Sequence, residues 1–261
     1  MDMGLRGRTA LVTGASRGIG KAVAEALAAE GVNLHLTATN RDLLEEVGAS
    51  LRSRFQVATT VHVADLSTAA GQESVCRATG PIDILVNNAG AVPRGTLLEI
   101  DDATWRKAWD LKVFGYINMT RAYYPQMVER KSGVVVNVIG LAGTQPNAKY
   151  IATSMANATL IMFTESLGGE SIRHGVRVVG INPGPTTSDR FINGQKRRAK
   201  AKWGDESRWQ EFLQELPAGR ASTPQECADM VVFLASDRAS AITGSCVLID
   251  GGLRNQVPPG F

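Results

Sequence analysis

The sequence lacks a long apolar run, and its cysteines are few and widely separated. No stretch of about 18 apolar residues occurs in the 261-residue chain, so no segment is expected to span a membrane. The three cysteines, Cys76, Cys227 and Cys246, form neither a metal-binding pattern nor a disulfide framework. A reducing, cytoplasmic location is therefore expected. The first residues, MDMGLRGRTA, also lack the apolar core of a secretory signal.

Strong charge of one sign is missing as well. The formal net charge is +3, with 20% charged and 44% apolar residues. So small a charge argues against a nucleic-acid-binding face, and the apolar content is too high for a disordered chain. At 261 residues, the sequence has the length of one large α/β domain.

Short apolar runs alternate with amphipathic segments along the chain. Strands are predicted at 9–13, 32–38, 57–63, 82–86, 133–138, 176–181 and 245–249. Helices are predicted at 18–30, 41–52, 101–128, 150–173 and 224–235, with another between the third and fourth strands. Strands joined by crossovers of ten or more residues pair in parallel. The fold class is therefore α/β, a doubly wound parallel sheet of about seven strands with helices on both faces.

One polar and basic segment, residues 186–217, interrupts this alternation. Insertions of this length in a compact domain are usually lids or binding loops, so a substrate-binding lid is expected. Five of the seven residues from Lys196 to Lys202 are basic. They are interpreted either as attracting an acidic substrate or as the solvated face of a helix with its aromatics packed inward. Phe191 and Trp203 are candidates for an apolar substrate wall.

A glycine-rich loop, T13-G-A-S-R-G-I-G20, follows the first predicted strand and opens the first predicted helix. Gly14 permits a tight turn, Gly18 lets the backbone approach a phosphate, and Gly20 lets the helix pack on the sheet. The helix N-terminus then offers unpaired N–H groups to a diphosphate. A purely structural turn is the alternative, but the strand–loop–helix context favours a dinucleotide site.

These features make the sequence similar to the short-chain dehydrogenase/reductase family. The T-G-x-x-x-G-I-G spacing matches, and so do Asp65-Leu66, Asn87–Gly90, Pro183-Gly184 and Asp250–Gly252, in the family's order. The resemblance implies a Rossmann-type domain over residues 1–261, with the lid at 186–217. It also implies a nicotinamide cofactor, a small-molecule carbonyl or alcohol substrate, and a homotetramer or homodimer built through the two long helices.

The resemblance also implies which residues contact the cofactor. Asp65 is expected to bind the adenine edge, with a helix N-terminal acid as the alternative interpretation. The other residues that match the family's contact positions are Gly14, Ser16, Arg17, Gly18, Ile19, Gly20, Leu66, Asn88, Ala89, Gly90, Pro183, Gly184 and Thr186.

The second predicted strand ends without the acidic residue that binds the adenosine ribose in NAD enzymes. Thr39 stands at about that position, and Asn40 and Arg41 follow. Arg17 faces the same ribose in the family's geometry. Two guanidinium groups and a missing carboxylate favour a 2′-phosphate. NADP(H) is therefore predicted, with NAD(H) as the alternative if both arginines are only solvated surface charges.

Of the four catalytic side chains that the resemblance implies, only the tyrosine is present. Tyr150 stands where family tyrosines begin the second long helix, but Ser154 occupies the lysine position four residues later. The serine position after the fifth strand is Gly140, which offers only its backbone. The asparagine position of the first long helix is Lys112. Asn157 returns to the helix face of Tyr150 and is a candidate polar partner for Ser154.

The hypothesis is that Lys112 replaces the missing lysine from the facing helix. An ordinary tyrosine has a pKa near 10, and a cation within about 4–6 Å favours the phenolate. Lys112 is therefore expected to place its ammonium near Tyr150 and the nicotinamide ribose, with Ser154 leaving room. The alternatives are an exposed helix lysine, an enzyme using Tyr150 alone or with altered chemistry, and a non-catalytic or regulatory nucleotide-binding protein. Candidates for the substrate wall are Val92, Arg94, Leu141, Ala142 and Gln145.

Overall fold

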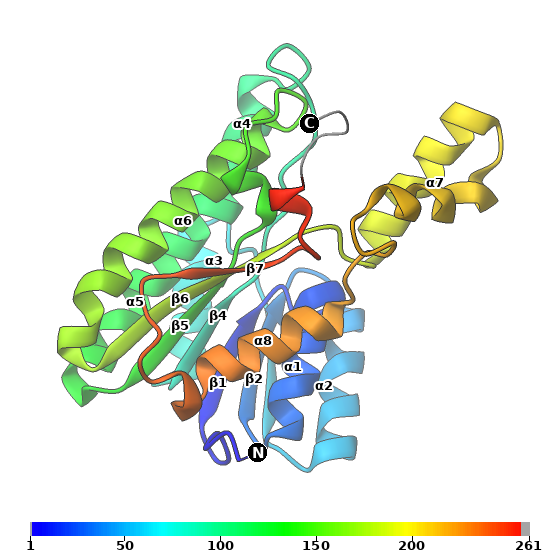
Figure 1. Ribbon diagram of the computed structural model, residues 1–261. Coiled ribbons are helices and arrows are strands. Elements are labelled where there is room, and N and C mark those ends of the chain that lie inside the picture. Colours follow the sequence, from blue (N-terminus) through cyan, green and yellow to red (C-terminus); the bar gives the residue numbers. More distant parts are fainter. Residues whose placement is uncertain (1, 257–261) are drawn as a thin grey trace.

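The computed structural model describes residues 2–256 as a seven-stranded, fully parallel sheet between two layers of helices (Figure 1). The strand order is β3-β2-β1-β4-β5-β6-β7. The strands are β1 (Thr9–Thr13), β2 (Asn33–Ala38), β3 (Thr59–Val63), β4 (Ile84–Asn87), β5 (Gly133–Val138), β6 (Val176–Pro183) and β7 (Cys246–Ile249). This is the doubly wound arrangement predicted from the sequence.

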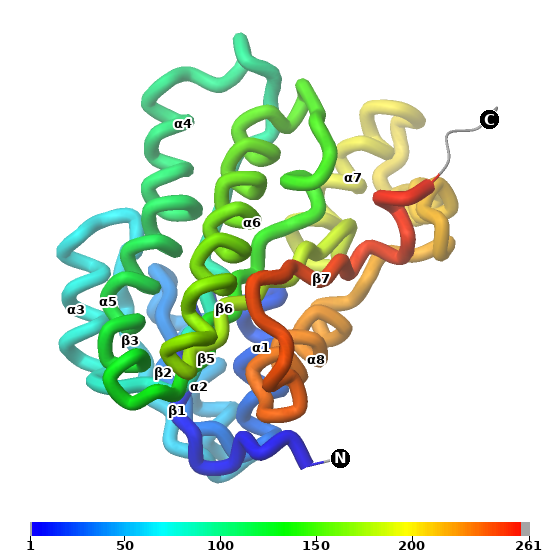
Figure 2. Tube along the Cα trace, turned by 60° about the vertical axis from the view of Figure 1, so that its left-hand side comes forward, coloured from blue at the N-terminus to red at the C-terminus, as the bar shows by residue number. Residues whose placement is uncertain are grey.

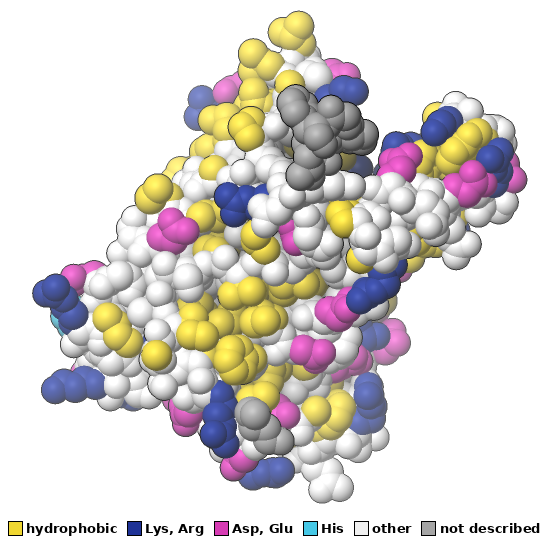
Figure 3. Space-filling view, viewed as in Figure 1, with side chains coloured by type: hydrophobic (Ala, Val, Ile, Leu, Met, Phe, Trp, Pro, Cys, Tyr) yellow, Lys and Arg dark blue, Asp and Glu magenta, His cyan; other side chains and the backbone are white. Residues whose placement is uncertain are grey.

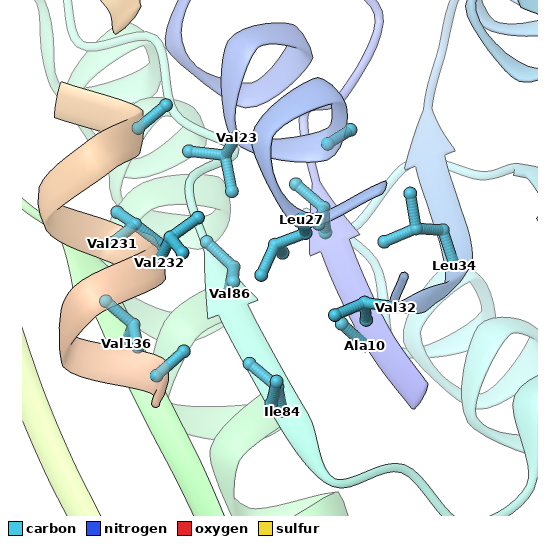
Figure 4. Close-up of a cluster of buried hydrophobic side chains, with 14 of the residues drawn as sticks. Ala10, Val23, Leu27, Val32, Leu34, Ile84, Val86, Val136, Val231 and Val232 are labelled. Carbon is cyan, nitrogen blue, oxygen red and sulfur yellow. The ribbon is translucent and has the colours of Figure 1, made fainter. Parts of the chain in front are cut away.

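Three helices, α1 (Gly18–Ala29), α2 (Arg41–Phe55) and α8 (Pro224–Ala235), cover one face of the sheet. Figure 4 shows how they are held: Val23 and Leu27 of α1 and Val231 and Val232 of α8 pack over the strands beneath. Burial of such side chains contributes about 1.5–3 kcal/mol each. β5 is buried at all six positions, as expected for a parallel strand covered on both faces.

The other face is covered by α3 (Ala69–Thr79), α5 (Gly115–Arg130) and α6 (Ile151–Ser171), while α4 (Asp102–Trp109) packs on the start of α6. Figure 2 shows α6 beside the α4–α5 pair. The predicted helix at 101–128 is present as a helical run from Asp102 to Arg130, but it contains a π-helical turn, Asp110–Phe114, between α4 and α5. Such turns widen a helix locally and occur often at functional sites.

The segment 186–217 is helical over most of its length, whereas no helix bounds are predicted within it from the sequence. It consists of α7 (Asp189–Trp203) and a 3₁₀ stretch, Glu206–Glu215, and it projects from the body of the molecule (Figure 1). Ser188 caps α7 by accepting a hydrogen bond from the Phe191 N–H. Further 3₁₀ turns cover Leu141–Thr144, Ile172–His174, Asp237–Ala239 and Leu253–Asn255. Within residues 2–256, no helix combines the length and apolarity needed to cross a bilayer.

Candidate active site

A cavity of about 700 Å³ lies where the strand order reverses, between the loops after β4, β5 and β6, the start of α6, and α7. Doubly wound sheets bind ligands at this place, outside the carboxyl ends of the strands. The predicted residues that line it are Ile19, Asn88, Gly90, Lys112, Gly140, Tyr150, Pro183, Gly184 and Thr186. The predicted residues absent from its lining are Gly14, Ser16, Arg17, Gly18, Gly20, Thr39, Asn40, Arg41, Asp65, Leu66, Ala89 and Ser154.

The glycine loop packs against the loop after β4. Gly14 has φ +67°, and a Cβ on it would lie 2.9 Å from the Cα of Ala89. The Asn88 Nδ2 donates to the carbonyl oxygens of Thr13 (2.9 Å) and Gly14 (3.2 Å), which joins the two loops. Arg17 occupies the N-cap position of α1 without a side-chain cap. The first N–H groups of α1 therefore remain available to an anion, as a diphosphate site requires.

The residues after β2 and β3 have local partners. The Asn40 side chain caps α2 by accepting from the Leu43 N–H over 3.0 Å, and Thr39 and Arg41 beside it are exposed. Asp65 accepts hydrogen bonds from the N–H (2.9 Å) and hydroxyl (2.7 Å) of Ser67. Asp65 thus shapes the turn before α3 while its second oxygen has no bond within residues 2–256.

Tyr150 is the N-cap residue of α6 and faces the cavity. Its backbone is joined to the loop after β4, because the Gly95 N–H donates to the Lys149 carbonyl over 3.0 Å and Gly95 bridges Tyr150. This junction brings Arg94 onto the tyrosine, with the Arg94 Cζ 4.9 Å from the ring centroid. The cation–π contact identifies a charged neighbour of Tyr150 that the sequence offered only as a wall residue.

Lys112 is buried, with a relative exposure of 7%, so the interpretation of an exposed lysine is wrong. It sits in the π-helical turn, and its Nζ donates to the Tyr116 hydroxyl (2.9 Å) and the carbonyls of Val138 (2.8 Å) and Ile139 (3.3 Å). Burial, and secondarily the nearby Arg190 charge, lower the pKa of Lys112 to about 7. Burial raises the pKa of Tyr116 well above its ordinary value, so its hydroxyl stays protonated.

Gly90 makes room for this lysine. A Cβ on Gly90 would lie 2.5 Å from the Lys112 Cδ, closer than real Cβ atoms approach another heavy atom. The aliphatic stem of Lys112 therefore crosses the backbone at Gly90 to reach the end of β5. Gly90 thus has a packing partner in this chain besides its predicted contact with the cofactor.

The expected pairing of Asn157 with Ser154 is wrong. The Asn157 Nδ2 donates to the Gly140 carbonyl over 3.3 Å, while the Ser154 Oγ is buried with no hydrogen-bond partner among the described residues. Gly140 has φ +137°, and a Cβ there would lie 2.8 Å from the Asn157 Nδ2. The glycine thus lets Asn157 occupy space that a side chain at position 140 would take. The Asn157 Oδ1 is also buried without a partner in residues 2–256.

Most of the basic residues between Lys196 and Lys202 do not line the cavity. Of the five basic residues only Arg198 lines the cavity, and it is paired with Glu215 (3.1 Å). Arg197, Lys200 and Lys202 are exposed, and Figure 3 shows Lys and Arg mixed with Asp and Glu on the projecting segment. This favours the interpretation of a solvated helix face.

The two aromatic residues proposed for the substrate wall, Phe191 and Trp203, lie in different surroundings. Phe191 lines the cavity, whereas Trp203 stacks on Phe212 with ring centroids 4.6 Å apart and is absent from the cavity lining. Trp203 therefore packs within the segment 186–217 itself. The five predicted wall residues, Val92, Arg94, Leu141, Ala142 and Gln145, all line the cavity.

Two residues that the sequence reasoning missed complete the site. Tyr116 is the partner of Lys112, and its position one helical turn later was the available signal. Arg190, at the start of α7, donates to the Val92 carbonyl over 2.7 Å and so connects α7 to the loop after β4. Partial burial, and then the charges of Arg94 and Arg17, lower the pKa of Arg190.

Within residues 2–256, no group of three or more His, Cys, Asp or Glu is placed to hold a metal ion.

Comparison with known proteins places this arrangement in a family. The family model described as Enoyl-(Acyl carrier protein) reductase matches residues 14–254. A 3-oxoacyl-(acyl-carrier-protein) reductase of Vibrio harveyi is 34% identical, over 96% of this chain and 99% of its own. The 2,3-dihydro-2,3-dihydroxybenzoate dehydrogenase of Bacillus subtilis is 31% identical, over 95% and 97% respectively.

Solved structures agree over the same length. L-Sorbose reductase from Gluconobacter frateurii, complexed with NADPH and L-sorbose, has a TM-score of 0.93 at 34% identity, covering 98% of this chain and all of its own. An NAD+-bound xylitol dehydrogenase has a TM-score of 0.86 at 28% identity, covering 95% and 99%. From the glycine loop, the sheet order and these full-length matches together, the chain belongs to the short-chain dehydrogenase/reductase family.

Proposed function

We propose that this protein is an NADP(H)-dependent oxidoreductase that interconverts a small carbonyl compound and its alcohol. The observation that carries the proposal is the position of Tyr150. It opens α6 inside the cavity, beside the loop after β4, which is hydrogen-bonded to the glycine loop. Its hydroxyl is the group that exchanges a proton with the substrate oxygen, because general acids act only within hydrogen-bond reach of the reacting atom.

The chain has a fitting place for a dinucleotide. The uncapped N-terminus of α1 suits a diphosphate, and Asn157, which lines the cavity, has a buried Oδ1 without a hydrogen-bond partner among the described residues. A bound nicotinamide supplies or accepts the hydride. Thr39 leaves the adenosine ribose without a carboxylate, so Arg17 and Arg41 favour a 2′-phosphate and hence NADP(H) over NAD(H). Support comes from L-sorbose reductase, which was solved with NADPH, although the xylitol dehydrogenase holds NAD+.

Lys112 has the role of a buried charge next to the reaction. It lines the same cavity as Tyr150 and Gly140 and enters from the helix opposite the family's lysine position. Its longest hydrogen bond, 3.3 Å to the Ile139 carbonyl, is the one that it can exchange most easily for a ribose hydroxyl. Charge that is pre-placed in a water-poor site stabilises a developing phenolate more than solvent does.

Polarisation of the substrate carbonyl differs from the family pattern, in which a serine takes part. Gly140 contributes no hydroxyl, so the substrate carbonyl is polarised by Tyr150 and by a group other than a serine. The segment 186–217 acts as a lid over cofactor and substrate, with Phe191 and Arg190 on its inner side.

A homotetramer or homodimer and a cytoplasmic location complete the proposal. Phe114 (50%), Met155 (47%) and Met162 (63%) are exposed on the outer faces of the π-helical turn and α6, where a second copy can cover them. The three cysteines are unpaired in the described chain, which suits a reducing compartment. Light scattering on the purified protein measures the mass directly.

The test is turnover by the purified protein with NADPH and a panel of ketones, aldehydes and acyl thioesters, followed by nicotinamide absorbance. We expect turnover in the wild type and a loss of at least about 100-fold in Tyr150→Phe, with an unchanged Kd for NADPH. Tight NADPH binding without turnover on any substrate would instead favour a non-catalytic, regulatory nucleotide-binding protein. Turnover that survives in Tyr150→Phe contradicts the assigned role of the tyrosine.

A further inference from the structure

All charged side chains that line the cavity within the described residues are basic. Four basic side chains, Arg94, Lys112, Arg190 and Arg198, line it, and none of the described lining residues is Asp, Glu or His. Arg198 is paired with Glu215, but the ion pairs within residues 2–256 do not include the other three. The guanidinium groups of Arg94 and Arg190 repel each other across this cavity, and an anion between them removes that repulsion.

The cofactor accounts for only part of this charge. In the proposed binding mode, Arg17 and the N-terminus of α1 take the phosphates at the glycine loop, and Lys112 is held by Tyr116 and two carbonyls. Arg190 lies close enough to both Arg17 and Arg94 for each charge to lower its pKa. Arg94 comes from the loop after β4 and stands over the Tyr150 ring. Arg94 is therefore the cation of the substrate half of the cavity.

The backbone on either side of Arg94 is fixed by contacts with the start of α6. Gly95 is bridged to Tyr150, the Gly95 N–H donates to Lys149, and the Thr153 hydroxyl donates to the Pro93 carbonyl over 3.4 Å. On its other side lies Gly194 of α7, on which a Cβ would stand 3.9 Å from the Arg94 Nη1. The guanidinium thus lies between Tyr150 and α7, and these contacts fix the backbone that carries Arg94 next to Tyr150.

We infer that the substrate is an oxo acid or hydroxy acid whose carboxylate is bound by Arg94, with Arg190 of the lid as second partner, while its carbonyl or alcohol faces Tyr150. A guanidinium presents a planar fork of N–H donors that matches a carboxylate. Because the Arg94 Cζ lies 4.9 Å from the Tyr150 ring centroid, one small molecule can place its carboxylate at Arg94 and its carbonyl or alcohol at Tyr150. This inference rests on the proposed function for the reaction, but not for the carboxylate site.

The turnover test compares acids with their neutral esters. Purified protein with NADPH is assayed on 2-oxobutyrate, 3-oxobutyrate and 4-oxopentanoate and on the methyl ester of each. We expect at least one acid to exceed its ester about 10-fold or more in kcat/KM. Arg94→Gln should lower that acid's kcat/KM about 10-fold, leaving the ester and the NADPH Kd within about 2-fold, because the variant loses one charge-assisted pair. Lys149→Gln removes an equal charge beside Tyr150 but outside the cavity lining and should change neither.

Arg190→Gln distinguishes the two sources of negative charge. A rise in the KM of the acid alone places Arg190 on the substrate, whereas a rise in the NADPH Kd alone places it on the cofactor diphosphate and leaves Arg94 as the substrate's only partner. Equal kcat/KM for acids and esters in the wild type overturns the inference while the proposed function stands. An equal loss on acid and ester in Arg94→Gln also overturns it.

A binding measurement decides the case in which no compound is turned over. Saturation-transfer NMR on the NADP+-loaded protein compares butyrate, hexanoate and benzoate with their amides. Binding of at least one carboxylate over its amide, lost in Arg94→Gln and kept in Lys149→Gln, supports the carboxylate site even if hydride transfer fails. No preference of the wild type for any carboxylate contradicts it.

Discussion

The Lys112 ammonium and the Tyr116 hydroxyl meet over 2.9 Å, and both donate to the Val138 carbonyl oxygen over 2.8 Å. The two residues are one helical turn apart, on either side of the junction between the π-helical turn and α5. Their shared acceptor is at the end of β5, where the family's serine loop begins. The amine of Lys112, which stands at the family's asparagine position, is thereby fixed beside the cavity.

The first prediction concerns the space that Gly90 leaves for Lys112. Gly90→Ala should destabilise the protein by about 1–3 kcal/mol, because its Cβ meets the Lys112 Cδ at 2.5 Å. In the Lys112→Ala background the same change should cost less than about 1 kcal/mol, since its collision partner is gone. Urea unfolding without cofactor measures all four corners of the cycle.

Gly169→Ala is the matched control for this cycle. Gly169 lies inside α6, and a Cβ there would meet no atom within 4 Å. Alanine should therefore be neutral or stabilising by up to about 1 kcal/mol. Equal costs of Gly90→Ala with and without Lys112 would show that the two side chains are not in contact.

The second prediction follows from the lowered pKa of Lys112. In the unfolded chain this lysine titrates near 10.5, and in the folded protein near 7. Between these values the unfolded state binds more protons, so the contribution of Lys112 to the free energy of unfolding rises with pH. The contribution is fully present above about pH 10.5 and is lost as the pH falls through 7. The difference between wild type and Lys112→Met should therefore shift in favour of the wild type by roughly 3 kcal/mol between pH 7 and 10.

Lys107→Met is the control for the titration, because Lys107 is exposed on α4. Its difference from the wild type should stay flat over the same pH range. A flat profile for Lys112→Met as well would mean that the Lys112 amine is solvated in the folded protein.

A third prediction tests the phosphate preference. Replacing Arg17 and Arg41 together by glutamine should raise the NADPH Kd about 10-fold or more, since two charge-assisted contacts to a phosphate are lost. The NADH Kd should change by no more than about 3-fold. Fluorescence titration measures both, with Arg77→Gln on α3 as a variant of an exposed arginine elsewhere. A wild type that binds NADH as tightly as NADPH removes the basis for the preference.

The regular part of the fold was within reach of the sequence. The bounds of β1, β5 and α8 were predicted to the residue, because apolar runs and the Pro224 start mark them sharply. The π-helical turn was not, since Asp101 to Val128 contains no helix breaker before Gly115 and a widened turn leaves no period of its own. A helix was one of two interpretations of the basic run from Lys196 to Lys202, but the polar segment around it predicted no bounds for α7.

The candidate site divides in the same way. Tyr150, Lys112 and Gly140, which were selected from motif positions, all line one cavity. The partners of Lys112 and the neighbours of Tyr150 could not be found, because Val138, Arg94 and Arg190 lie on other elements and meet them only through tertiary packing. Asn157 was assigned to Ser154 because one helix face holds both, yet it points to Gly140 on the loop after β5.

The measurement that tests the central claim most directly is the turnover number of Lys112→Met, which keeps most of the buried side chain and removes the charge. With a substrate established for the wild type, the account predicts a loss in kcat of about 100-fold or more, by analogy with the removal of other preorganised charges. The NADPH Kd should stay within a few-fold, and circular dichroism should show a folded protein. A kcat within about 2-fold of the wild type would contradict a catalytic role for Lys112 and leave Tyr150 to act without it.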